Sequence, residues 1–219
     1  MAPRAGCGHP RAGGAARRGA RRGAHPDRGG RPRRARAGAP ARRGGGAGRG
    51  PAALGARRWA RVALRARDEG DVVVDAQLLV YPMLDDREAT VSSRGVVDPR
   101  VWDVTKNRHA WAAYLGGVAG TVRPGDAGVP AYAAPARADD LRRLPRTWLA
   151  TAELDLFCDE DVAYAARLLE VGVSVELHVY PGAVHGFDVF APASAVARRF
   201  VAERTRAFRT FLAPASDLH

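Results

Sequence analysis

The first 53 residues of the chain contain no Val, Leu or Ile and no aromatic residue. A segment of this composition cannot bury enough apolar surface to offset the conformational entropy that folding removes. Any folded domain is therefore restricted to the rest of the chain. The sequence predicts a disordered segment rich in Arg, Gly and Ala over residues 1–58, followed by a folded region over residues 59–219.

Charge divides the chain at nearly the same place. Residues 1–67 hold 19 arginines and a single acid, Asp27, whereas residues 68–219 carry 16 basic and 22 acidic residues. The net charge of +12 thus comes from the first segment alone. Arginine-rich tracts can bind nucleic-acid phosphates through charge, but residues 1–58 contain no Tyr or Phe to stack on bases. Plain disorder is favoured, and nucleic-acid binding is kept as an alternative.

The cysteines and the apolar runs exclude several kinds of protein. Cys7 and Cys158 lie in different parts of the chain, and no spacing indicates a metal site or a disulfide framework. We therefore expect no metal or other cofactor. No apolar run approaches the roughly 20 residues that a membrane span needs, so we expect no membrane partner and a cytoplasmic location. The oligomeric state is not indicated.

Strand and helix patterns alternate after residue 59. Near-continuous apolar runs predict buried strands, and residues with helical spacing predict helices between them. The expected strands are 77–81, 147–152 and 175–180. One expected helix ends at residue 69, before Gly70, and three more span 98–116, 159–171 and 195–212. This order favours an α/β fold with a parallel sheet flanked by helices.

Two polar residues follow neighbouring predicted strands at their carboxyl ends, where open α/β sheets place functional groups. Asp155 comes three residues after one strand, and His185 lies in a turn after the next. A carboxylate there can orient an imidazole that acts as a general base. The alternatives are structural: Asp155 could cap the following helix, although Asp159 is better placed, and His185 could be a turn residue.

Other candidates near these positions are interpreted as structural. Asp159, Glu160 and Asp161 fall in the first turn of a predicted helix, where acids complement the helix dipole. His178 alternates within a strand and is interpreted as a residue of one sheet face.

Several long motifs occur in a fixed order over about 150 residues. They are residues 78–87 (LLVYPMLDDR), 98–102 (DPRVW), 110–116 (AWAAYLG), 132–138 (YAAPARA), 151–161 (TAELDLFCDED) and 176–188 (ELHVYPGAVHGFD). Through these motifs residues 63–212 resemble the hormone-sensitive-lipase-like carboxylesterases, the α/β-hydrolase fold-3 group. The resemblance implies a partial α/β-hydrolase fold, hydrolysis of small-molecule carboxylic esters, Asp155 as catalytic acid and His185 as catalytic base.

The nucleophile of that family is missing from this sequence. The family carries a His-Gly-Gly-Gly oxyanion loop and a Gly-x-Ser-x-Gly elbow upstream of the region matched here. The serines of the chain are Ser92, Ser93, Ser174, Ser194 and Ser216, and none has Gly at both −2 and +2. Ser174 follows Gly172 but precedes Glu176, so it is interpreted as a loop residue. We find no candidate nucleophile and expect a nearly inactive, marginally stable or aggregation-prone chain.

Codon usage offers a reason for this loss. The chain has no Ile, one Lys (Lys106) and one Asn (Asn107), which indicates a very GC-rich gene. Out-of-frame translation of such DNA yields mainly Arg, Ala, Gly and Pro. We hypothesise that residues 1 to about 61 are a frame-shifted reading of the family's N-terminal half, which resequencing the gene would test. A non-catalytic remnant is the remaining alternative.

Overall fold

The structure is a computed structural model that describes residues 53–118 and 122–213. The segment predicted to be disordered lies outside these residues except for 53–58. Those six residues form the beginning of helix α1 (Ala53–Glu69), which moves the start of regular structure upstream of residue 59. Ala, Leu and Arg, which fill most of these positions, are strong helix formers.

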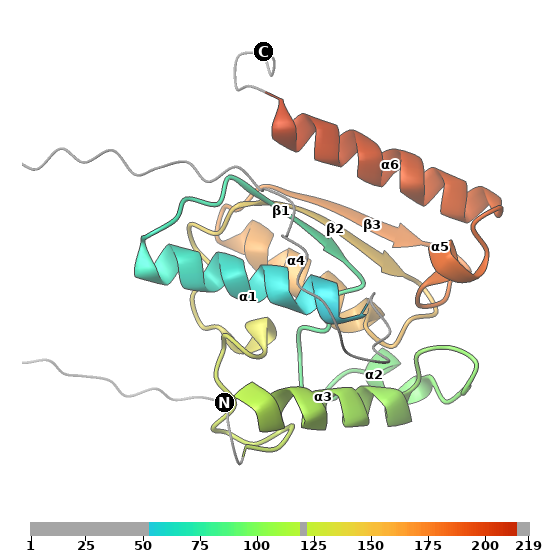
Figure 1. Cartoon of the computed structure of the whole chain (residues 1–219), viewed down its shortest axis with the longest axis horizontal. Coiled ribbons are helices and arrows are strands. Elements are labelled where there is room, and N and C mark those ends of the chain that lie inside the picture. The colour runs from blue at the N-terminus through green and yellow to red at the C-terminus, as the bar shows by residue number, and fades with distance from the viewer. Residues whose placement is uncertain (1–52, 119–121, 214–219) are drawn as a thin grey trace, which may run out of the picture. The chain divides into compact units, whose positions relative to one another are not determined.

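Three parallel strands form the sheet, in the order β1-β2-β3 (Figure 1). They are β1 (Ala76–Val80), β2 (Arg146–Ala152) and β3 (Val175–Tyr180). Each lies within one residue of the predicted strand, so the parallel α/β interpretation is confirmed. Ala152 pairs with Tyr180, so β2 and β3 end at the same level.

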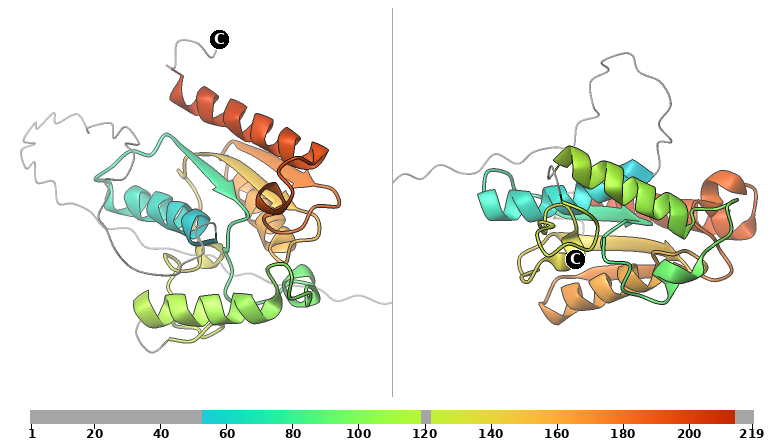
Figure 2. Two further views of the ribbon diagram at one scale, coloured as in Figure 1. Left: turned by 45° about the vertical axis from the view of Figure 1, so that its right-hand side comes forward. Right: turned by 90° about the horizontal axis from the view of Figure 1, so that it is seen from below.

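Helices cover both faces of the sheet (Figure 2). Because side chains alternate along a strand, Leu149 of β2 packs against α1 and α4 (Cys158–Glu170), whereas Trp148 and Ala150 pack on the side of α6 (Ala195–Leu212). Phe200 of α6 lies within 5.5–6.2 Å, centroid to centroid, of the rings of Trp148, Tyr81, Tyr180 and Phe187. The α6 face of the sheet is therefore an aromatic core.

The helix predicted over 98–116 begins later, as α3 (Val104–Val118). The Oδ1 of Asp103 accepts a hydrogen bond from the backbone N–H of Lys106 at 2.8 Å, which caps the first turn. Asp98 instead accepts the N–H of Arg100 at 2.9 Å within a preceding turn. The remaining short helices are α2 (Ser92–Gly95), η1 (Pro135–Arg137) and α5 (Phe187–Phe190).

A third apolar cluster joins α3 to the loops that follow β1 and β2. Trp111 and Leu115 of α3 are fully buried with Met83 from the first loop and Leu156 and Phe157 from the second. The loop that carries Asp155 therefore packs against α3 and is also attached to the sheet, because it directly follows β2.

The ends of α1 and α4 agree with the glycine signals, whereas α3 continues two residues past the end predicted at 116. Gly70 follows α1 with φ +72°, and Gly172 follows α4 with φ +82°, as helix-terminating glycines do. The interpretation of Asp159 as the better-placed cap of α4 is wrong. The helix begins one residue earlier, at Cys158, with Phe157 at the cap position, so Asp159 lies within the first turn.

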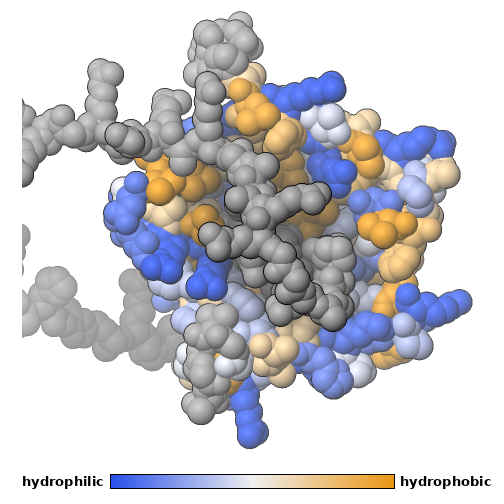
Figure 3. Space-filling model, viewed as in Figure 1, coloured by the Kyte–Doolittle hydropathy of each residue, from blue (hydrophilic) through white to orange (hydrophobic). Residues whose placement is uncertain are grey.

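The sheet has a free edge at β1, since no strand in the described part of the chain pairs with its outer side. Large apolar side chains are also exposed on α6, where Phe208 is 53% and Leu212 62% exposed, and on α5, where Phe190 is 65% exposed. Figure 3 shows apolar surface among charged residues on the viewed face. Exposed strand edges and apolar patches favour association.

We predict that Phe200→Ala will destabilise the chain by about 3–5 kcal/mol, because the change empties the centre of the aromatic core. Phe208→Ala is the matched control on the same helix, and it should stay within about 0.5 kcal/mol of the native chain because its ring is exposed. Urea unfolding followed by tryptophan fluorescence measures both. Equal effects of the two substitutions would contradict the packing of α6 on the sheet.

The purified chain should associate with increasing concentration and unfold over a broad temperature range, because β1 and α6 leave edge and apolar surface uncovered in the described residues. Size-exclusion chromatography with light scattering and calorimetry measure these properties. A monomer that unfolds in one cooperative thermal transition would show that the expectation of marginal stability is wrong.

Candidate active site

The structure brings Asp155 and His185 together, as the sequence predicts. The Nδ1 of His185 lies 2.7 Å from the Oδ2 of Asp155. Asp155 follows β2 and His185 follows β3, and these adjacent parallel strands present their carboxyl ends at the same edge. The residues are 1% and 8% exposed, so the hydrogen bond is almost entirely removed from water. Their catalytic roles stay a prediction.

The loop of Asp155 holds its carboxylate in place. The backbone N–H of Phe157 donates to the second oxygen, Oδ1, at 3.2 Å, and the N–H of Asp155 donates to the carbonyl of Ala152 at 3.1 Å. A carboxylate only accepts hydrogen bonds, so Nδ1 of His185 is the donor. In the neutral imidazole this tautomer leaves the lone pair on Nε2, the atom that can act as a base.

Three aromatic rings enclose the imidazole. The ring centroids of Tyr81, Phe157 and Trp102 lie 5.4, 5.5 and 5.7 Å from that of His185. They come from the end of β1, the beginning of α4 and the segment before α3. The sequence places Tyr81 at the end of a predicted strand and Trp102 in a predicted helix, and both in family motifs. It does not place either ring beside His185, because contacts between distant segments have no local signal.

Tyr81 has a backbone conformation that residues other than glycine rarely adopt. Its φ is +46°, in the left-handed region, and it is immediately followed by Pro82. Its ring is buried, and burial raises the pKa of its phenol. A strained non-glycine residue in contact with a candidate base marks the end of β1 as part of the site.

Two buried carboxyls lie behind this pair, on the first turn of α4. Glu160 accepts the backbone N–H groups of Leu84 and Asp85 at 2.7 and 3.1 Å, which ties the loop after β1 to α4. Burial raises its pKa well above the ordinary value, and the charges of Asp85 and Asp155 add to this, against the lowering effect of the two N–H groups. The sequence position of Glu160 predicts a structural acid but not its burial.

Asp161 is fully buried beside Glu160. Burial raises its pKa well above the ordinary value, the charge of Glu160 raises it further, and the hydroxyl of Thr151 lowers it. Asp159 differs from both because it is exposed and accepts the N–H of Ser92 at 2.8 Å. All three acids thus lie in the first turn of α4, as the sequence predicts, but only Asp159 is exposed to solvent.

The other residues weighed in the sequence take structural positions. His178 lies on β3, 2.8 Å from a carboxylate oxygen of Glu176, as a residue of one sheet face. Ser174 lies at the entry to β3, where its carbonyl accepts the N–H of Thr147 at 2.8 Å. No hydroxyl or thiol among the residues that the structure describes hydrogen-bonds Nε2 of His185, and no cluster of His, Cys, Asp and Glu in those ranges could hold a metal ion.

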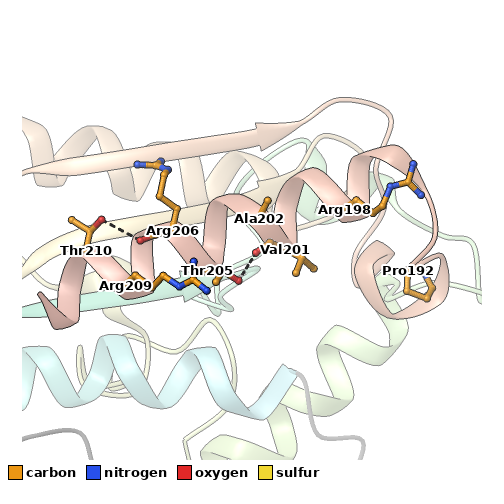
Figure 4. A pocket seen from close by; sticks show the side chains of 8 residues that line it. All are labelled: Pro192, Arg198, Val201, Ala202, Thr205, Arg206, Arg209 and Thr210. Carbon is orange, nitrogen blue, oxygen red and sulfur yellow. Dashed lines mark hydrogen bonds between the residues drawn. The ribbon is translucent and has the colours of Figure 1, made fainter.

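A groove of about 690 Å³ lies elsewhere, along the outer side of α6 (Figure 4). Its polar groups are largely engaged within the fold. The hydroxyls of Thr205 and Thr210 donate to carbonyls one turn earlier, at 2.7 and 3.1 Å, and Arg206 pairs with Glu176. Neither Asp155 nor His185 lines it, so it is not the candidate site.

Among the helices that the structure describes, none has the length and apolar character that a membrane span needs.

Comparison with known proteins gives a consistent family. A sequence model described as "alpha/beta hydrolase fold" matches residues 53–189. Esterase LipI of Mycobacterium tuberculosis is 33% identical over 132 residues, which cover 60% of this chain and 39% of LipI. Among solved structures, a bacterial heroin esterase is 46% identical with a TM-score of 0.66, covering 71% of this chain and 48% of that one.

Another similar structure is esterase LipW from Mycobacterium marinum, 35% identical with a TM-score of 0.63, which covers 71% of this chain and 46% of LipW. The chain thus spans less than half the length of these relatives. The family match begins at residue 53, within the segment to which the sequence hypothesis assigns a shifted frame, and that hypothesis stays untested.

We predict that Glu160→Gln will change how stability depends on pH. The unfolded chain releases the Glu160 proton near the ordinary pKa of 4.5, whereas the folded chain holds it to a higher pH. The native glutamate therefore favours folding below pH 4.5 and loses that contribution as the pH rises through the folded pKa. Relative to the native chain, the glutamine variant should gain about 1.4 kcal/mol for each pH unit between the two pKa values.

Urea unfolding from pH 4 to 8 measures this difference, because the effects of groups that do not interact with Glu160 cancel between the two proteins. Glu170→Gln is the control, since Glu170 is exposed at the last turn of the same helix. A difference between Glu160→Gln and the native chain that is constant with pH would contradict a raised pKa of Glu160 in the folded chain.

Proposed function

The chain belongs to the α/β-hydrolase fold family, in its hormone-sensitive-lipase-like group, and on that premise we propose that it supplies the acid–base half of a carboxylic ester hydrolase site. The observation that supports this most directly is the buried 2.7 Å hydrogen bond between His185 and Asp155. It sits at the carboxyl ends of two parallel strands, where this architecture places its chemistry. The esterase relatives support the same class of reaction.

In the proposed reaction Nε2 of His185 takes the proton from a serine hydroxyl as its oxygen attacks the ester carbonyl. Nε2 then returns the proton to the leaving alkoxide, and the same steps with water release the acid. Asp155 keeps the proton on Nδ1 and stabilises the imidazolium that forms in between. The substrate is a small-molecule ester, and its acyl group is not indicated by the described residues.

The attacking serine has no counterpart in the sequence, since no Gly-x-Ser-x-Gly motif occurs in it. Losing the nucleophile from such a site costs on the order of 10⁶-fold in turnover. We therefore expect this chain alone to hydrolyse esters near the background rate. The cytoplasmic location expected from the sequence stays a prediction.

Fragment complementation tests the proposal. The full chain is co-expressed with a family segment that carries the His-Gly-Gly-Gly and Gly-x-Ser-x-Gly motifs, and hydrolysis of p-nitrophenyl butyrate is followed. We expect activity at least about 10³-fold above the chain alone, because the segment restores the nucleophile and oxyanion hole. His185→Ala should abolish it, while His178→Ala, on the strand face, should retain it.

Two results would contradict the proposal. A co-purified complex without hydrolysis would support a non-catalytic remnant, and hydrolysis that survives His185→Ala would place the base elsewhere. A nucleic-acid binder would instead show affinity that falls steeply with salt and is unchanged by His185→Ala.

A further inference from the structure

Glu153 joins the two loops that carry the candidate acid and base. It is the first residue after β2, two residues before Asp155. Its Oε2 accepts the backbone N–H of Gly182 at 2.7 Å, and Gly182 lies in the turn that leads from β3 to His185. A side chain from the loop of the acid thus holds the backbone of the turn of the base.

Backbone hydrogen bonds run beside this contact. The N–H of Glu153 donates to the carbonyl of Tyr180 at 3.1 Å, and the N–H of Leu154 donates to the carbonyl of Ala183 at 2.9 Å. The loop therefore follows the turn residue by residue, from the end of β3 to the position two residues before His185. These three hydrogen bonds, made by Glu153 and Leu154, form a strap between the loop and the turn. The bond of the Glu153 carboxylate is the one that a side-chain substitution can remove.

Gly182 is the residue of the turn that most needs such a restraint. Its φ is +67°, and apart from Gly182 itself and its two chain neighbours no atom lies within 4 Å of the place where a Cβ would stand. Glycine has more conformational freedom than any other residue, so packing does not fix the direction of this N–H. A carboxylate acceptor at 2.7 Å does fix it, because hydrogen bonds to charged acceptors are the shorter and stronger kind.

We propose that Glu153 is a positioning residue for His185: by holding Gly182, it sets the turn so that Nδ1 meets Asp155. The proposal rests on the proposed function, since it concerns the same imidazole. A hydrogen bond of 2.7 Å between Nδ1 and Oδ2 tolerates a shift of only about 0.5 Å before its geometry degrades. Glu153 acts through the turn and does not touch the reacting atoms.

Nuclear magnetic resonance of the full chain with ¹⁵N-labelled histidine and glycine tests the proposal. In Glu153→Ala we expect the Gly182 amide to exchange with solvent about fivefold faster, the effect of losing one net hydrogen bond. The ¹⁵N shifts of His185 should also show a smaller fraction of the Nδ1–H tautomer. Glu153→Gln keeps an acceptor oxygen and should restore both signals to within twofold of the native chain.

Glu170→Ala is the control, since it removes an exposed glutamate from the far end of α4. An unchanged His185 tautomer in a folded Glu153→Ala chain would overturn the proposal, and so would a glutamine variant as altered as the alanine one. If the alanine variant does not fold, the exchange of the Gly182 amide in the native chain and in Glu153→Gln tests the proposal instead. A Gly182 amide that exchanges in the native chain at the rate of an unprotected amide overturns the proposal, and a protected amide that stays protected in Glu153→Gln supports it.

The test is independent of ester hydrolysis. Tautomer and exchange are measured without substrate, so a chain that fails in complementation can still show the Glu153 effect. Conversely, complementation could restore hydrolysis equally in the native chain and in Glu153→Ala, with the His185 tautomer unchanged. That result would support the proposed function and contradict the positioning role of Glu153.

Discussion

The pairing of β2 with β3 is the constraint on which the site depends. Ala152 and Tyr180 are register partners at the ends of the two strands, so the loops that follow begin at the same level. From there the backbone strap between Glu153, Leu154 and the turn after β3 keeps the loops together up to Asp155 and His185. A shift of the register would separate the carboxylate from the imidazole even if both residues were retained. The Asp155–His185 contact is thus a consequence of strand pairing.

The sequence predicted the elements and the pair, because those depend on local patterns. Apolar runs located the strands within one residue, and the carboxyl-end rule selected Asp155 and His185. It did not predict which acids of α4 are buried, since Glu160 and Asp159 have the same type of position in the sequence and differ only in what packs against them. Tyr81 in the left-handed region and the contact of Glu153 with Gly182 were missed for the same reason. Each depends on segments that meet only in the fold.

The buried acids of α4 impose a second constraint on the loop of Asp155. Glu160 and Asp161 lie close enough for the charge of Asp155 to raise their pKa values, so adjacent negative charges there would repel one another. Burial raises the pKa of both side chains, which favours their neutral forms and so lessens that repulsion. Glu160 still binds the loop after β1, because its carbonyl oxygen accepts the N–H groups of Leu84 and Asp85 in the neutral form as well. One residue therefore ties the loop after β1 to α4, next to the loop that carries Asp155.

The distribution of what is kept and what is missing favours the hypothesis of a changed reading frame over gradual decay. Gradual loss of function would leave substitutions spread over the whole fold, including the residues of the candidate site. Here Asp155, His185 and the aromatic rings around them are all present, and the chain is 46% identical to a bacterial heroin esterase where the two overlap. The change is abrupt: the family match begins at residue 53, and Leu54 is the first leucine of the chain. Asp155 and His185 thus lie in the matched part of the chain, downstream of a segment that lacks every apolar pattern, and this is the order that the hypothesis of a shifted frame expects.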